Sequence, residues 1–262
     1  MGKKEKEEPL NFYIISDIHS NFDSLEITYN NLKKETNETK VVILGDILTY
    51  GLKPIETINL LLKINDDFET HFLIGNHDQI YFDIQHGLKP KYHMSAFVKN
   101  SVDWTLKQIQ KVSLYKLFNW KWNYQIQNIF FSHANPFEDG NWSYLEQEES
   151  LNSAFNKLDL MNAGLGVFGH SHRQRIYKNS QTYTLGKTKL DLKRGPYILN
   201  AGSIGQPRGN SLSFCKLALE NDMALINFEK VDFKYQIMIN DIMGSDLDIK
   251  TKSCLMQFWA ND

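Results

Sequence analysis

Cysteine is scarce in this sequence. Only two of its 262 residues are cysteines, Cys215 and Cys254, and they do not form a Cys-x-x-Cys pair. This scarcity argues against a disulfide framework and against metal sites built from thiolates. We expect both residues to be reduced, buried thiols.

The chain also lacks an excess of positive charge and a long apolar run. Lys and Arg number 29 against 31 Asp and Glu, so nothing in the composition indicates a broad nucleic-acid or membrane-binding surface. No apolar stretch approaches the length of a transmembrane helix, and the mixed-charge run over residues 1–8 lacks the apolar core of a secretory signal. We expect a cytoplasmic protein with a disordered tail over residues 1–10 and a single domain over residues 11–262.

In the first half of the chain, short apolar runs alternate with helical patterns. Apolar runs over residues 12–15, 41–44 and 71–74 predict three strands. Two helices are predicted between them, over residues 22–32 with Asn21 as the N-cap, and after Pro54. Continuous apolar strands joined by helices are typical of a buried, largely parallel sheet.

The second half begins with a helix expected over residues 94–111. Residues 118–126 then alternate aromatic or aliphatic side chains with polar ones, which predicts a half-buried strand. Its aromatic row fits core packing better than the stacking of nucleobases. Turn residues separate the later apolar runs, and these predict hairpins in a second sheet: 175–178, 183–185, 197–199, 212–219 and 224–228.

Five of the expected strands end in the same way. They are the three apolar runs of the first half and two further runs, at residues 129–131 and 166–168. Each run reaches a Gly or Ser that is followed at once, or nearly so, by Asp, Asn or His. The residues at these ends are Asp17, His19, Asp46, Asn76, His77, Asp78, His133, His170 and His172. Because the carboxyl ends of strands form the crevice where sites are built in open α/β sheets, we expect these side chains to gather in one place.

This set of carboxylates, imidazoles and one amide suits a metal centre. The Asp46 carboxylate can bridge two cations, and mixed nitrogen and oxygen ligands favour Mn, Fe, Co, Ni or Zn over Mg or Ca. Each residue also has a structural explanation when taken singly: Asp17 or Asp46 could cap a helix, and His133 could be a hydrogen-bonded core histidine. Their order at successive strand ends favours the metal interpretation. Three histidines outside the pattern are expected to be structural or surface residues: His71, His86 and His93.

The ordered set resembles the calcineurin-like metallophosphoesterase superfamily. That family's pattern is Asp-x-His, Gly-Asp, Gly-Asn-His-Asp/Glu, a His after a strand, and Gly-His-x-His, and all five blocks occur here in order between Asp17 and His172. More narrowly, the chain is similar to the small prokaryotic phosphodiesterase-like branch. Three further stretches carry this similarity: residues 45–54 (GDILTYGLKP), 132–136 (SHANP) and 200–208 (NAGSIGQPR).

The resemblance implies a four-layer α/β/β/α sandwich of two mixed sheets flanked by helices. It also implies two divalent transition metal ions, with manganese first and Fe, Ni, Co or Zn as alternatives, that share an attacking hydroxide. One ion would be bound by Asp17, His19, Asp46 and His172, and the other by Asp46, Asn76, His133 and His170. His77 would be the catalytic histidine that assists the leaving group, and Asp78 would orient His77 and keep it protonated.

Two features depart from other members of the superfamily. Protein Ser/Thr phosphatases continue the Gly-Asp block with an arginine that binds phosphate, whereas Thr49 and Tyr50 stand in this region here. Arg208 is a candidate substitute for substrate binding, or else an arginine that braces the sheet. The chain also continues over residues 221–262, and this extension could add strands or bind a partner.

The leading interpretation is a phosphodiesterase or phosphatase that hydrolyses a small phosphoester or a nucleotide. Two alternatives stay open. A non-catalytic scaffold of the same fold is disfavoured because His77 and every expected ligand are retained. A nuclease is disfavoured because the chain lacks a basic stripe.

Overall fold

The computed structural model describes residues 9–179, 181–183, 186–209 and 211–260. The described strands form two mixed sheets. Sheet A has seven strands in the order β10 (Thr188–Asp191), β13 (Met223–Lys230), β12 (Ser213–Glu220), β1 (Leu10–Ile15), β2 (Thr39–Ile43), β3 (Thr70–Leu73) and β4 (Trp120–Lys121). Sheet B has six in the order β5 (Asn123–Ile126), β6 (Ile129–Ser132), β7 (Leu165–Phe168), β11 (Tyr197–Ala201), β8 (Gln174–Lys178) and β9 (Gln181–Tyr183).

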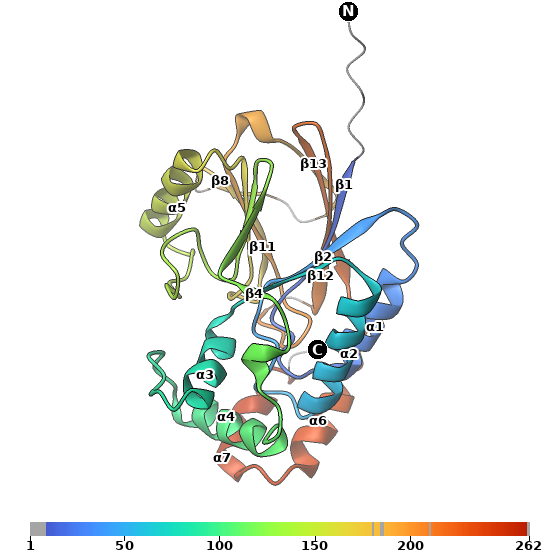
Figure 1. The fold of residues 1–262 in the computed structure, drawn as a ribbon, viewed down its shortest axis with the longest axis vertical. Helices are drawn as coiled ribbons and strands as arrows, with labels where there is room; N and C mark the ends of the chain where they lie inside the picture. The colour runs from blue at the N-terminus through green and yellow to red at the C-terminus, as the bar shows by residue number, and fades with distance from the viewer. Residues whose placement is uncertain (1–8, 180, 184–185, 210, 261–262) are drawn as a thin grey trace, which may run out of the picture.

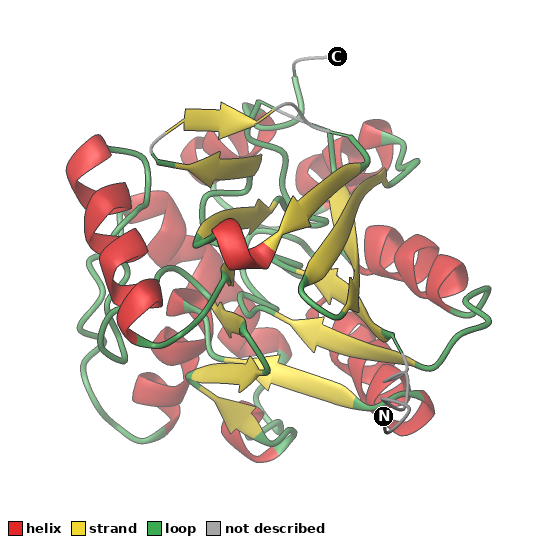
Figure 2. Ribbon diagram, turned by 90° about the horizontal axis from the view of Figure 1, so that it is seen from above, coloured by secondary structure: helices red, strands yellow, loops and turns green. Residues whose placement is uncertain are grey.

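Helices flank the two sheets on both sides (Figures 1 and 2). Helices α1 (Phe22–Leu32) and α2 (Pro54–Asp67) lie beside sheet A, and α5 (Glu148–Leu160) lies beside sheet B. The other α-helices of the described chain gather at the lower end of Figure 1: α3 (Asn76–Gln85), α4 (Ala96–Gln108), α6 (Tyr235–Gly244) and α7 (Ile249–Met256). This arrangement confirms the predicted sandwich of two mixed sheets between helices.

The continuous apolar runs of the sequence are explained by strands that are buried on both faces. In β1, Phe12 and Ile14 point into the core between the sheets, where they meet Phe131 of sheet B. Tyr13 and Ile15 point the other way, into the core beneath the helices. A separate core packs α5 on the far face of sheet B. Burial on both faces removes the alternation of polar residues that marks a half-exposed strand.

The local signals for the first two helices are confirmed. The side chain of Asn21 caps α1, because its Oδ1 accepts a hydrogen bond of 3.2 Å from the backbone N–H of Ser24. Pro54 occupies the first position of α2, where its missing N–H costs nothing. The helix expected over residues 94–111 is α4.

The single half-buried strand predicted over residues 118–126 is wrong. The segment forms two short strands, and they belong to different sheets: Trp120 in β4 pairs with Phe72 in sheet A, whereas Tyr124 in β5 pairs with Phe131 in sheet B. The chain crosses from one sheet to the other at Trp122, so the alternation of aromatic residues continues through a change of sheet. These aromatic residues pack into the cores, as expected.

Three smaller predictions need adjustment. Leu10, predicted to lie in the tail, is already part of β1, and residues 1–8 lie outside the described part. The predicted strand over 183–185 is observed over Gln181–Tyr183, with 184–185 outside the described residues. Both cysteines are free, but Cys254 is only partly buried.

The extension over residues 221–262 contributes one strand and two helices in its described part, namely β13, α6 and α7. No described helix combines the length and the apolar character needed to cross a bilayer.

Parallel pairing sets the position of the strand ends. β1, β2 and β3 are parallel neighbours, and so are β6, β7 and β11. The carboxyl ends of each set therefore open at one edge of their sheet. Hydrogen bonds join the two edges, because His133 Nδ1 lies 2.7 Å from the carbonyl oxygen of Leu44, and His170 N donates to Asp17 Oδ2 at 3.1 Å.

Candidate metal centre

The predicted ligands form two adjacent groups at this junction of the sheets. In the first group, Asp17 Oδ1 lies 3.3 Å from His172 Nε2, and His19 Nε2 lies 3.1 Å from His172 Nε2. The second group contains Asp46, His133 and His170, and in each group the ligand atoms lie within 4.8 Å of one another. All six residues of the two groups are buried.

Asp46 and Asn76 complete this arrangement. Asp46 Oδ2 lies 3.4 Å from His133 Nε2 of the second group and 3.8 Å from His19 Nε2 of the first, so one carboxylate oxygen faces both groups. Asn76 Oδ1 lies 3.2 Å from His133 Nε2, which places the amide in the second group. The structure thus brings the seven residues predicted as ligands together in two adjacent groups.

The histidine rings are oriented by backbone carbonyl groups. The Nδ1 atoms of His19 and His172 lie 3.0 and 2.9 Å from the carbonyl oxygens of Leu48 and Gln206. Since a carbonyl only accepts, each Nδ1 carries the hydrogen, and in a neutral ring the Nε2 atom presents a lone pair. Two such lone pairs then face each other across 3.1 Å. A cation between them removes the repulsion, so the geometry fits a metal ion.

A buried carboxylate oxygen supports the same conclusion. Asp17 Oδ2 accepts hydrogen bonds from Ser16 Oγ at 2.5 Å and from His170 N at 3.1 Å. Asp17 Oδ1 is buried and has no hydrogen-bond partner within the described chain. A buried anionic oxygen without a donor is costly, and coordination to a cation supplies the missing partner.

Several of these residues adopt a backbone conformation that side chains usually avoid. Positive φ angles of 47–62° occur at five predicted ligands: Asp17, His19, Asp46, His170 and His172. Each costs on the order of 1–2 kcal/mol in a non-glycine residue. Close packing of neighbouring loops maintains this conformation. At Gly75, for example, an added Cβ would lie 2.2 Å from Asp46 Oδ1.

His77 lies beside the ligands, but Asp78 does not orient it, which corrects the prediction. The Asp78 carboxylate accepts three backbone N–H groups, those of Asp46, Ile47 and Gly75, at 2.7–3.1 Å. The ring of His77 is instead held between two hydroxyl groups. Its Nδ1 lies 3.1 Å from Thr49 Oγ1, and its Nε2 lies 3.2 Å from the hydroxyl of Tyr50.

The contacts of the two side chains do not support the expectation that Asp78 keeps His77 protonated. Burial lowers the pKa of His77 to about 4, only partly offset by the negative charge of Asp46. Burial and the same Asp46 charge raise the pKa of Asp78 to about 7. Sequence order could not reveal this, because Asp78 follows His77 directly, yet in the first turn of α3 its side chain turns back toward the loop after β2.

The carboxylates of the centre remain ionised. Burial raises the pKa of Asp17, but the adjacent His172 outweighs it, and the net pKa lies well below the usual value. His133 shows the complementary effect: burial lowers its pKa, but Asp46 raises it to about 9. At His170, burial and the charge on His133 lower the pKa to about 3. Ionised carboxylates are the form that binds divalent metals, and a bound metal ion would displace the proton that His133 holds beside Asp46.

Aromatic residues and one arginine surround the centre. The Tyr144 ring stacks on His170 with 4.2 Å between ring centroids, and the Tyr50 ring lies 5.0 Å from His77. Arg208, the predicted substrate-binding residue, is half-buried, and its positive charge acts on His77 and His172. The sequence interpretation assigned no role to Thr49 or Tyr50, although their place three and four residues after Asp46 could have suggested one.

The other histidines lie outside the centre, as predicted. His71 stacks on Tyr124 at 3.9 Å between ring centroids, and His86 Nδ1 lies 2.7 Å from the carbonyl oxygen of Phe82. His93 is exposed.

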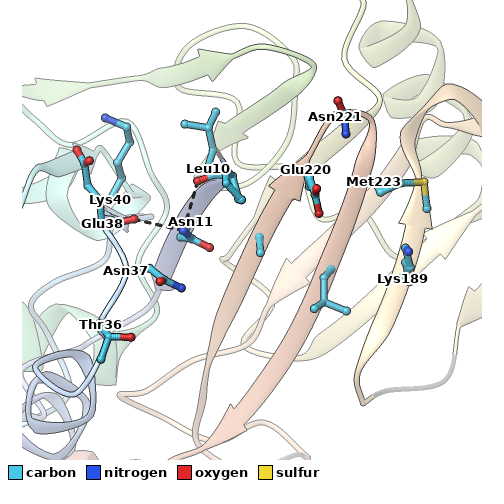
Figure 3. A pocket seen from close by; sticks show the side chains of 13 residues that line it. Leu10, Asn11, Thr36, Asn37, Glu38, Lys40, Lys189, Glu220, Asn221 and Met223 are labelled. Carbon is cyan, nitrogen blue, oxygen red and sulfur yellow. Dashed lines mark hydrogen bonds between the residues drawn. The ribbon is translucent and has the colours of Figure 1, made fainter. Parts of the chain in front are cut away.

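A separate groove lies elsewhere on the molecule. It has a volume of about 1230 Å³ and lies at the amino end of β1 and β2, opposite the strand ends that carry the ligands (Figure 3). Asn11 is held there by the carbonyl oxygens of Pro9 and Glu38. The groove contains none of the predicted site residues.

Comparison with known proteins identifies the family. Residues 10–222 match the calcineurin-like phosphoesterase superfamily domain. The chain belongs to the calcineurin-like phosphoesterase superfamily. It is 31% identical over 235 residues to an uncharacterized protein of Methanocaldococcus jannaschii, covering 86% of this chain and 85% of that protein. It is also 28% identical over 79 residues to a symmetrical bis(5'-nucleosyl)-tetraphosphatase of Vibrio parahaemolyticus, which covers 30% of this chain and 29% of that enzyme.

Solved structures share the fold of this phosphoesterase-family chain. A metallophosphoesterase from Sphaerobacter thermophilus superimposes with a TM-score of 0.73 at 21% identity, covering 96% of this chain and 99% of that one. A hypothetical protein from Pyrococcus horikoshii gives 0.72 at 16% identity, covering 94% and 97%. Family membership and the two groups of ligands together indicate a divalent metal centre.

Proposed function

We propose that this chain is a metal-dependent phosphoesterase that hydrolyses a phosphodiester or phosphomonoester of a small molecule or nucleotide. The observation that carries the proposal is the pair of buried ligand groups that meet at Asp46, next to His77. The buried Asp17 oxygen without a donor favours a cation here, and family membership indicates the class of reaction.

In this proposal the two groups hold two divalent transition metal ions. Asp17, His19, Asp46 and His172 would bind one ion, and Asp46, Asn76, His133 and His170 the other. Such a pair lowers the pKa of a bound water and neutralises charge on the phosphoryl oxygens. The mixed nitrogen and oxygen donors favour manganese or another of Fe, Co, Ni and Zn over magnesium.

His77 would assist the departure of the leaving oxygen. Burial raises the pKa of Tyr50, so its hydroxyl stays protonated and can donate to Nε2 of a neutral His77 ring, while Nδ1–H donates to Thr49. The ring is thereby fixed beside the ligands. An anionic substrate favours the charged imidazole, which prepares His77 to hold a proton for the leaving group.

Arg208 would bind the phosphate. No ion pair joins its guanidinium to a carboxylate in the described part of the chain, although it is half-buried near the metal ligands. A half-buried cation without an anionic partner favours the binding of an anionic ligand. The local similarity to a bis(5'-nucleosyl)-tetraphosphatase supports a nucleotide as one candidate substrate.

The test is metal reconstitution. Protein stripped with a chelator is re-supplied with Mn²⁺, Ni²⁺, Zn²⁺ or Mg²⁺ and offered bis-p-nitrophenyl phosphate and p-nitrophenyl phosphate. We expect metal-dependent turnover, and the ratio of diester to monoester rates narrows the substrate class. No turnover with any of these metals on either ester would contradict the proposal and favour a scaffold.

The matched control is His77→Ala. We expect kcat to fall by about 10²–10⁴-fold, the usual contribution of a general acid, while metal content stays at the level of the unmodified protein. Loss of metal in this variant would instead make His77 a ligand.

A further inference from the structure

The last part of the chain lies outside the family match but reaches the candidate site. The match ends at residue 222, and β13, α6 and α7 follow it. After α7 the chain turns, with Phe258 N donating to the carbonyl oxygen of Leu255. This turn places the Phe258 ring against Arg208, with the guanidinium carbon 5.9 Å from the ring centroid.

The turn that carries Phe258 is firmly anchored. Trp259 is 4% exposed and packs edge-on against Phe233 and Tyr235, with centroid distances of 5.9 and 5.2 Å. Such edge-on aromatic contacts stabilise by more than their buried area. The neighbouring residue Phe258 therefore has a defined position.

Helix α4 connects this extension to the metal centre. On one side, Asn100 donates to Asp248, the N-cap of α7, at 3.0 Å, and Trp104 Nε1 donates to Asp246. On the other side, Ser101 Oγ accepts the backbone N–H of Tyr50 at 2.8 Å. One helix thus fixes both the extension and the loop that holds His77.

Several groups hold the guanidinium of Arg208, and the side chain of Tyr144 is one of them. The Nε and Nη2 atoms of Arg208 both lie 3.3 Å from Gln206 Oε1, and the carbonyl of Gln206 holds the metal-ligand candidate His172. Phe258 supplies an aromatic surface beside it. An arginine has five N–H donors, so this bracing leaves donors for an anion.

We propose that Phe258 is a positioning residue for phosphate recognition, and that the C-terminal extension thereby forms part of the substrate-binding wall. Phe258 holds the Arg208 guanidinium by cation–π contact in the orientation that receives the non-bridging oxygens of a phosphoester. This inference rests on the proposed function for the identity of the ligand. By this inference the C-terminal extension, which lies outside the family match, directly affects substrate affinity.

The test compares KM and kcat for bis-p-nitrophenyl phosphate in Mn²⁺-loaded variants. Phe258→Ala and Phe258→Leu should raise KM about three- to tenfold, with kcat within about twofold, because the ring face is lost. Phe258→Tyr should retain the KM of the unmodified protein. Ile249→Ala, at a residue 85% exposed in the same extension, is the matched control and should change neither parameter.

A double-mutant cycle separates positioning from general loosening. If Phe258 acts through Arg208, Phe258→Ala should add nothing to the KM of Arg208→Ala. Additive effects in the cycle, or an unchanged KM in both Phe258→Ala and Phe258→Leu, would overturn the inference.

Orthophosphate binding distinguishes failure of this inference from failure of the proposed function. Calorimetric titration of the Mn²⁺-loaded variants with inorganic phosphate needs no turnover. Suppose that no ester is hydrolysed, but phosphate binds three- to tenfold more weakly to Phe258→Ala than to the unmodified protein. Suppose also that phosphate binds the double variant as tightly as it binds Arg208→Ala. The proposed function then fails and the positioning role of Phe258 stands. Equal phosphate affinity in the unmodified protein and Phe258→Ala would overturn the role whatever the turnover.

Discussion

At the scale of single residues, the candidate centre depends on side chains that neutralise one another only in part. Asp17 leaves one buried oxygen without a donor, and the Nε2 atoms of His19 and His172 face each other. Protein groups alone do not satisfy this arrangement, so it stores unfavourable energy until a cation enters. The left-handed backbone at the same positions adds to that energy and persists only because the surrounding loops fix it.

Asp46 offers the sharpest test of the shared centre. Its Oδ2 faces both groups, so Asp46→Asn, which removes the charge at constant shape, should lower the occupancy of both metal sites together. Metal content per chain, measured by atomic spectroscopy after dialysis, reports this directly. Full retention of one metal would count against a bridging role.

Asp78 should prove structural. Asp78→Ala removes the acceptor of three buried backbone N–H groups, and we expect a loss of about 2–4 kcal/mol in the free energy of unfolding. Denaturant unfolding of chelator-treated protein measures it. Thr49→Val is the contrasting variant. It removes one contact of His77 and one of the Tyr81 hydroxyl, and it should lower kcat with a smaller loss of stability than Asp78→Ala. A large fall in kcat for Asp78→Ala at unchanged stability would restore the role predicted from the sequence.

At the scale of elements, the site is made by loops that approach one another very closely. An added Cβ at Gly75 would meet Asp46 Oδ1 at 2.2 Å and Asp46 N at 2.5 Å. Glycine at this position therefore lets the loop after β3 lie against the loop after β2. The distance between the two groups of ligands depends on this contact.

Gly75→Ala should accordingly displace Asp46. We expect a loss of about 1–3 kcal/mol in stability and a clear drop in metal content, since the overlap is with backbone and a fixed carboxylate. Gly244→Ala is the control, because Gly244 ends α6 with open space around it. Thermal unfolding and metal analysis of both variants check this. Metal content equal to that of the control would contradict it.

Prediction from the sequence succeeded for the strands whose ends carry candidate ligands. Apolar runs that end in ligand residues identified β1, β2, β3, β6 and β7, because burial on both faces and a shared edge are properties of the strands themselves. It failed at residues 118–126, where alternation continues while the chain changes sheets. It also missed the partners of His77 and the contact of Phe258, which depend on how distant loops pack.

At the scale of the whole molecule, the centre joins the two sheets. Each group of ligands combines residues that follow strands of sheet A with residues that follow strands of sheet B. Asp17 and His19 meet His172 in one group, and Asp46 meets His133 and His170 in the other. The metal centre and the apolar core between the sheets therefore hold the same interface together.

Removal of metal should therefore lower global stability. A ligand at about a thousand times its Kd stabilises the folded state by about 4 kcal/mol, which for a chain of this size corresponds to roughly 10 °C in Tm. Calorimetry with and without chelator measures the difference. His77→Ala should show the same shift as the unmodified protein. A Tm independent of metal would contradict a centre that joins the sheets.

The position of β1 has a consequence for folding during synthesis on the ribosome. β1 is the first strand of the described chain and is followed closely by Asp17 and His19. It lies in the middle of sheet A, and one of its neighbours is β12. The edge of β1 that pairs with β12 therefore stays unpaired until about 200 further residues have been translated, whereas its other neighbour, β2, follows early in the chain. The set of candidate ligands is complete only after His172 has emerged, so a metal centre that uses all of them cannot form earlier in synthesis. Until β12 has been made, the apolar run from Phe12 to Ile15 lacks one of its two neighbouring strands.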